Sequence, residues 1–254
     1  HRAGDKSAGL IRKTGRFGPL AGAAVGIVPQ CGFSAAAASL YSGGLVTAGT
    51  LMAVFLSTSD EMLPIFISEA VRVPTILKIL GMKVLLAAVT GLVLDLLIRR
   101  FRKQEVHKEI HDLCEHEHCH CEEGSIFRSA LRHTLQIALF LFVITLLLEL
   151  GIHLLGEETI SGFLTGQPVL GVFLASLVGL IPNCASSVII TQLYLSGLLG
   201  AGQMMAGLLV SCGVGLLVLF RTNQKLKENL KITGVLYLAG VLWGLLIEGL
   251  GVTF

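Results

Sequence analysis

The sequence predicts an all-α membrane protein with the architecture of an inverted-repeat transporter, containing two broken or re-entrant helix hairpins. The chain is 53% hydrophobic and only 14% charged, and its apolar runs reach the length of about 20 residues that crosses a bilayer. The segment that begins at Val25 also recurs from Val178, and 14 of the 35 positions between Val25 and Ser59 are identical in the copy. Such an internal repeat predicts a duplicated structural unit.

The repeat divides the chain into three parts. These are a first unit at 1–99, a polar loop at 100–125 and a second unit at 126–254. His1–Asp5 is similar to His153–Glu157, which follows an apolar stretch, so the first unit should also have an upstream helix. That helix is missing, and we expect the native protein to continue N-terminally by at least one span.

Loop charges predict the topology, because basic loops face the cytoplasm. On this rule the inside loops are 1–16, 99–132 and 221–231, and the outside loops are 67–78 and 155–167. Two apolar segments separate the inside loop from the outside loop in each unit, although an odd number of crossings is required. We therefore expect the segments broken at Pro29 and Pro182 to enter and leave by one face of the cytoplasmic membrane. The alternative is a spanning helix with a proline kink.

Polar residues at the two breaks predict a binding site. Gln30 corresponds to Asn183 and Cys31 to Cys184 in the alignment of the two units. A backbone that leaves its helical hydrogen bonds in a membrane must lie inside protein or line a cavity. Half-helix N-termini would favour an anion there, and freed carbonyl groups a cation. The candidate substrate-binding residues are Gln30, Cys31, Ser34, Thr58, Ser59, Asp60, Glu61, Asn183, Cys184, Ser186 and Ser187.

Two of these interpretations have simpler alternatives. Ser34 and Ser187 could merely cap the returning half-helices. Asp60 and Glu61 lie in an apolar segment, where a carboxylate costs about 2.5–3.5 kcal/mol and usually binds an ion or a proton; alternatively, Leu45–Ser59 already spans and Asp60 lies at the outer interface. The carboxylates near span ends, Asp95, Glu149 and Glu248, are expected to be solvated.

The polar loop contains a cluster of metal-ligand residues. They are His107, His111, Cys114, His116, His118, Cys119, His120 and Cys121. Imidazole and thiolate groups bind zinc and similar metals, and cysteines on the reducing cytoplasmic side are seldom in disulfides. We therefore predict a zinc-like transition-metal site with a role in sensing, buffering or delivery. The alternative is a solvated charged loop.

Four motifs resemble those of a known family. They are Val28–Ser34, Ser57–Pro64, Cys114–Cys121 and Ile181–Ser187. Together they resemble the bacterial and archaeal heavy-metal exporter family, whose members are labelled arsenic efflux proteins or manganese transporters. The resemblance covers essentially the whole chain and implies a multi-pass efflux permease of the cytoplasmic membrane.

These observations lead us to expect a secondary active exporter that works by alternating access at a midplane site. Carboxylates favour a divalent, manganese-like ion, whereas the thiols favour softer metals or arsenite. The sequence has no nucleotide-binding Gly-rich loop, so an ion or proton gradient would drive transport. We expect membrane lipid and a metal ion or small inorganic substrate as partners, no nucleic acid and no required cofactor. A homo-oligomer is an open alternative.

Three other functions stay open on the sequence alone. The half-helix N-termini could bind a phosphate-like oxyanion, which would make the protein an oxyanion carrier. Cys31 and Cys184 could form the redox pair of a membrane thiol oxidoreductase, provided that their Cα atoms lie about 4.4–6.8 Å apart. The metal-ligand loop could also serve a sensor for which the membrane part is only an anchor, although the duplicated polar breaks argue against this.

Overall fold

The computed structural model describes residues 17–59, 61–101, 168–252 and 254, together with six isolated helical positions between 135 and 150. Within these residues all the regular secondary structure is helical, which confirms the predicted all-α class. Four segments are long and apolar enough to cross a membrane: Ala48–Ser68, Val73–Arg100, Ala201–Thr222 and Leu226–Gly249. These four segments indicate a membrane protein.

The sequence repeat reappears as a repeat of helix positions. The first unit contains α2 (Gly18–Val25), α3 (Cys31–Ser42), α4 (Ala48–Ser57), α5 (Met62–Ser68) and α6 (Val73–Phe101). The second contains α10 (Pro168–Gly179), α11 (Cys184–Leu195), α12 (Ala201–Val210), α13 (Gly215–Thr222) and α14 (Leu226–Gly249). Helices α3 to α6 each begin 153 positions before α11 to α14, which is the separation of Cys31 from Cys184.

The two interruptions predicted at the prolines are present. Proline lacks a backbone N–H group and its ring clashes with the preceding turn, so a helix does not continue through it unchanged. Helix α2 ends four residues before Pro29, and α10 ends three residues before Pro182. The residues after the prolines, Gln30 and Asn183, have extended backbones. Each proline thus separates two short helices.

A second pair of interruptions divides segments that the sequence presents as continuous apolar spans. Residues 58–61 separate α4 from α5, and residues 211–214 separate α12 from α13. Helix α4 has ten residues, which gives a length of about 15 Å. This is about half the thickness of a bilayer's apolar core, so α4 by itself is short for a span, and the candidate span runs from Ala48 through the break to Ser68.

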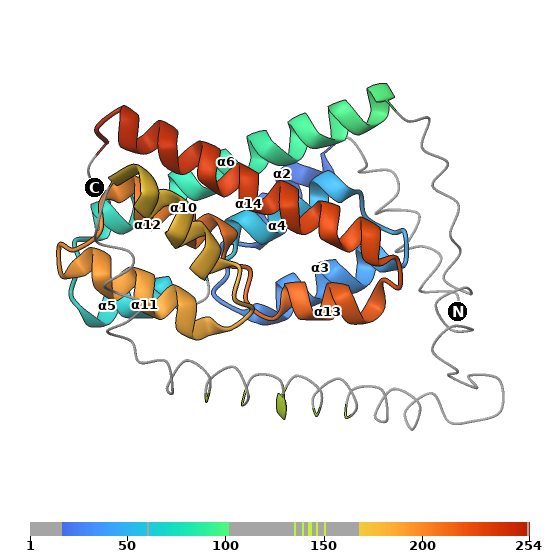
Figure 1. The fold of residues 1–254 in the computed structure, drawn as a ribbon, viewed down its shortest axis with the longest axis horizontal. Helices are drawn as coiled ribbons and strands as arrows, with labels where there is room; N and C mark the ends of the chain where they lie inside the picture. The colour runs from blue at the N-terminus through green and yellow to red at the C-terminus, as the bar shows by residue number, and fades with distance from the viewer. Residues whose placement is uncertain are drawn as a thin grey trace.

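Each unit packs mainly within itself, and the two units meet through a few helix pairs. Helix α4 packs against α2 and α6, and α12 packs in the same way against α10 and α14. Helix α3, however, lies against α13 of the second unit, while α11 lies against α5 of the first. Figure 1 shows the pair α3–α13 toward one end of the long axis and the pair α5–α11 toward the other.

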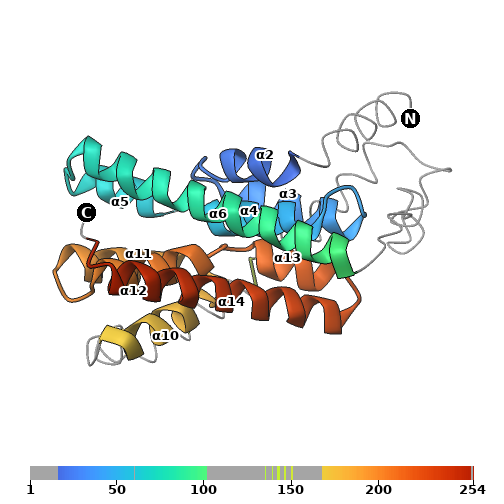
Figure 2. The ribbon, with the colours of Figure 1, turned by 90° about the horizontal axis from the view of Figure 1, so that it is seen from above.

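Burial separates central from outer helices. Each segment has a most apolar stretch of 18 residues. In α12–α13, 83% of that stretch is buried, whereas the buried share is only 33% in α6 and 39% in α14. Several leucines on α6 and α14 are largely exposed, for example Leu96 and Leu242. Figure 1 shows α6 and α14 along the same upper edge of the molecule, and Figure 2 shows α6 in the layer of the first unit and α14 in the layer of the second. The Trp243 indole N–H joins the two helices by a hydrogen bond to Thr90 Oγ1 at 2.8 Å. Apolar faces of this extent fit contact with lipid.

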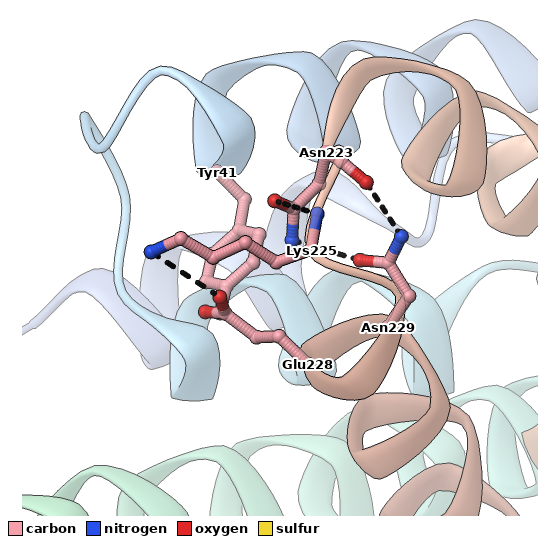
Figure 3. A network of polar contacts seen from close by, with 5 residues as sticks. All are labelled: Tyr41, Asn223, Lys225, Glu228 and Asn229. Carbon is pink, nitrogen blue, oxygen red and sulfur yellow. Dashed lines mark hydrogen bonds and ion pairs between the residues drawn. The ribbon is translucent and has the colours of Figure 1, made fainter.

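A polar network fixes the C-terminal end of α3 to the turn between α13 and α14 (Figure 3). The Tyr41 hydroxyl donates to Glu228 Oε1 at 2.6 Å, and Lys225 lies 3.9 Å from the same carboxylate. Beside them, Asn223 Nδ2 donates to Asn229 Oδ1 at 2.8 Å, and Asn229 Nδ2 donates to the carbonyl oxygen of Asn223 at 2.7 Å. This end of α3 therefore lies level with the start of α14.

Candidate functional site

The tips of the two proline-broken segments meet. Cys31 is the first residue of α3 and Cys184 is the first residue of α11, and their Sγ atoms are 3.6 Å apart. Neither cysteine is in a disulfide, and both are of intermediate burial. The N-termini of two helices therefore converge on one pair of sulfur atoms, and their positive dipole ends favour negative charge at that point.

The residues paired by the alignment do not have equal surroundings. Asn183 is buried, and its Oδ1 accepts a hydrogen bond from the Ala185 amide at 3.4 Å, as an N-cap does. Gln30 holds the corresponding N-cap position of α3, but its side chain forms no cap bond and is exposed. The expected symmetry therefore holds for the cysteines and fails for the carboxamides.

The two serines at equivalent positions of the units, Ser34 and Ser187, do not act as helix caps. Ser34 Oγ donates to the carbonyl oxygen of Cys31, and Ser187 Oγ donates to that of Cys184, both at 2.8 Å. Because the helices begin at the cysteines, both serines lie inside the first turn rather than at the N-cap. The capping alternative is wrong, and each hydroxyl keeps lone pairs that can accept a hydrogen bond.

The second pair of breaks contributes the remaining polar groups. Ser59 Oγ donates to the carbonyl oxygen of Ile27 at 2.8 Å, which ties the break before α5 to the break before α3. Thr58 Oγ1 donates to the carbonyl oxygen of Val54 at 2.7 Å. On α11, after the proline break, Ser186 Oγ donates to the carbonyl oxygen of Asn183 at 2.8 Å. All three hydroxyl residues are buried. Glu61, at the N-cap of α5, is half-buried.

Sequence reasoning missed Lys83, which lies on α6 and is 1% exposed. Its ammonium group donates to the carbonyl oxygen of Thr58 and to that of Leu208, the latter at 2.9 Å. The signal was present, because a lysine inside an apolar span is costly and usually functional. The sequence interpretation considered only the carboxylates of the apolar segments.

Lys83 and several predicted residues line one narrow crevice. Its lining residues are Thr58, Ser59, Met62, Lys83, Ser187, Leu208 and Ser211. They come from both breaks of the central spans and from α5, α6, α11 and α12. The space between them is too small for a water molecule.

Other predicted residues fall outside the described part of the chain. Asp60 is one of them, and so is the whole metal-ligand set from His107 to Cys121. Among the residues that the structure does describe, no three His, Cys, Asp or Glu side chains are grouped closely enough to hold a metal ion.

The comparison with known proteins assigns no family. No protein-family model matches this chain, and no curated protein or solved structure is significantly similar to it. The resemblance to the heavy-metal exporter family therefore remains an expectation that depends on the four sequence motifs.

Proposed function

We propose that the protein is a secondary active transporter of the cytoplasmic membrane, built as an inverted repeat, which exports a small thiophilic ion such as arsenite or a zinc-like divalent metal. The observation that carries this proposal is the 3.6 Å approach of Cys31 Sγ to Cys184 Sγ at the meeting point of two broken segments. Interrupted helices that meet inside a repeat structure are typical of secondary transporters. The export direction rests on the family resemblance.

The course of α2 and α3 supports a re-entrant hairpin. A Cβ atom at Gly18 would meet Thr50 in the first turn of α4, and one at Gly26 would meet Ser57 at its last residue. Helix α2 therefore runs alongside α4 in the same direction, as far as the break. Helix α3 then leads back, since residues 43–47 connect it directly to the start of α4. Both ends of the pair α2–α3 lie level with the start of α4.

The surroundings of two equivalent tyrosines support opposite orientations of the units. Tyr41 binds Glu228 at the start of α14, whereas the Tyr194 hydroxyl donates to the carbonyl oxygen of Phe254, beyond the end of α14, at 3.4 Å. Helix α14 has 24 residues, a length of about 36 Å. If α14 crosses the membrane, the hairpins that end near these tyrosines enter from opposite faces.

The sulfur pair indicates the class of substrate. A tetrahedral ion bound by two thiolates at about 2.3 Å holds the sulfurs about 3.8 Å apart, close to the separation of Cys31 and Cys184. Little movement would be needed for both to bind one soft ion, and the helix N-termini would stabilise the thiolate charge. A hard, manganese-like ion would instead require oxygen ligands such as Glu61.

Flux into proteoliposomes tests the proposal. Arsenite, Zn²⁺, Mn²⁺ and phosphate are compared, each with and without a pH gradient. We expect arsenite or Zn²⁺ to be transported, and Cys31→Ala and Cys184→Ala each to reduce the rate at least about tenfold, about 1.4 kcal/mol. Ser39→Ala is the matched control, because Ser39 lies on α3 and donates only locally, to Ala35.

The outcomes separate the alternatives. Undiminished transport in both cysteine variants would refute the sulfur site. Transport of Mn²⁺ alone would place the site on oxygen ligands, and transport of phosphate alone would identify an oxyanion carrier.

A further inference from the structure

The buried ammonium group of Lys83 lies between the carboxyl ends of two helices. Helix α4 ends at Ser57 and α12 ends at Val210, and Lys83 donates to carbonyl oxygens at both ends, those of Thr58 and Leu208. These two partners are 25 and 125 positions away from Lys83 in the chain. One cation therefore joins a broken span of the first unit to a broken span of the second.

The breaks explain why these carbonyl groups can bind a cation. The last four carbonyl groups of a helix have no helical N–H partner. At the end of α12, the Ser211 amide bonds to Gly207, so Leu208 provides the next carbonyl. The carboxyl end of each helix also carries a partial negative charge, which attracts cations. Two such ends facing one point form a site suited to a single positive charge.

The site is not duplicated, although its surroundings are. The position equivalent to Lys83 in the second unit is Leu236, which is fully buried. A single lysine thus serves both units, as expected for a group located between them.

We propose that the carboxyl ends of α4 and α12 form a monovalent-cation site and that the Lys83 ammonium group is its tethered occupant. The positive charge at this point holds the central spans of both units together at their breaks. Transport then requires that charge, supplied by the protein rather than by a dissolved sodium-like ion. The transport part of this inference rests on the proposed function; the cation site itself does not.

Replacement of the tethered cation by a free one provides the test. In Lys83→Ala the site loses its charge and gains space for a small cation, whereas in Lys83→Met an uncharged chain of similar length fills the space. The melting temperature of each purified protein is measured in ammonium, methylammonium and choline chloride at equal ionic strength and pH. Flux is measured in the same salts.

We expect the wild-type melting temperature to be the same in all three salts. That of Lys83→Ala should be lower in choline and rise saturably with ammonium, with partial recovery of flux. Lys83→Met should show no ammonium-specific rise, and its flux should fall at least tenfold.

Three results would overturn the inference. One is the absence of an ammonium-specific rise in Lys83→Ala, and another is failure of that variant to fold even in ammonium. The third is wild-type flux in Lys83→Met. A protein that shows the ammonium effect but moves none of the tested ions would refute the proposed function alone.

Discussion

Asp95 Oδ1 accepts a hydrogen bond from the backbone amide of Gly49 at 2.8 Å, in the first turn of α4. Its other oxygen accepts one from the Thr47 hydroxyl at 2.7 Å. The same relationship recurs 153 positions later, where Glu248 Oε2 accepts from the amide of Gly202 at 3.1 Å in the first turn of α12. Asp95 is buried, so the expectation that it is a solvated carboxylate at a span end is wrong.

Removal of this carboxylate should destabilise the protein. Asp95→Ala leaves the Gly49 amide without its partner at the positive end of α4, which should cost about 1–3 kcal/mol. The melting temperature in detergent should therefore fall clearly, and the fall should be smaller for Asp95→Asn, which keeps one acceptor oxygen. An unchanged melting temperature for Asp95→Ala would show that the carboxylate contributes nothing to the stability of α4.

The sequence was sufficient to predict the helical class, the repeat and the breaks at Pro29 and Pro182, because these depend on local chemistry and on identities in register. It was not sufficient for the second pair of breaks. Residues 211–214 contain no proline, and the turn there requires only a positive φ of 55° at Gly213. The carbonyl groups freed by such a break have partners from distant segments, such as Lys83, and no local pattern reports them.

The helix pairs that join the two units were also not predictable from the sequence. Tyr41 and Tyr194 are identical in the repeat, yet one contacts Glu228 and the other contacts Phe254. The alignment of two units shows which residues correspond, but not which unit provides their neighbours. For that reason the structure was needed to show that Cys31 contacts Cys184. It was also needed to show that Gln30 is exposed whereas Asn183 is buried.

Two glycines are packed too closely against a neighbouring helix to be replaced by alanine. A Cβ atom at Gly91 would lie 2.9 Å from Ala53 Cβ, and one at Gly244 would lie 2.5 Å from Ala206 Cβ. Such overpacking costs about 1–3 kcal/mol, so Gly91→Ala and Gly244→Ala should each lower the melting temperature.

The same helices provide matched controls for this prediction. Gly81 lies on α6 and Gly234 on α14, and a Cβ atom at either would meet nothing within 4 Å. Gly81→Ala and Gly234→Ala should leave stability unchanged or raise it slightly, since alanine favours the helix. Equal losses in all four variants would show that helix flexibility, rather than close packing, explains the effect.

Oxidation should join Cys31 to Cys184. Their sulfurs need to move only from 3.6 Å to about 2.05 Å. In a variant with the loop cysteines replaced by serine, diamide should take one electron and one proton from each of these two thiols and leave Cys212 reduced. Peptide mass spectrometry would identify the disulfide. A bridge to Cys212 instead would contradict the observed pairing, and transport that continues after complete oxidation would argue against movement of the two tips apart.

The side of the membrane on which each hairpin opens gives the last prediction. Tyr41→Cys and Tyr194→Cys are made in a cysteine-free background and labelled with an impermeant maleimide in right-side-out and inverted vesicles. Because Tyr41 lies by the start of α14 and Tyr194 lies beyond its end, the two should be labelled from opposite faces. Exposed positions near the ends of α14 provide references: Lys227→Cys should match Tyr41→Cys, and Gly249→Cys should match Tyr194→Cys. Labelling of both tyrosine positions from one face would exclude hairpins of opposite orientation, and with them the shared transport site.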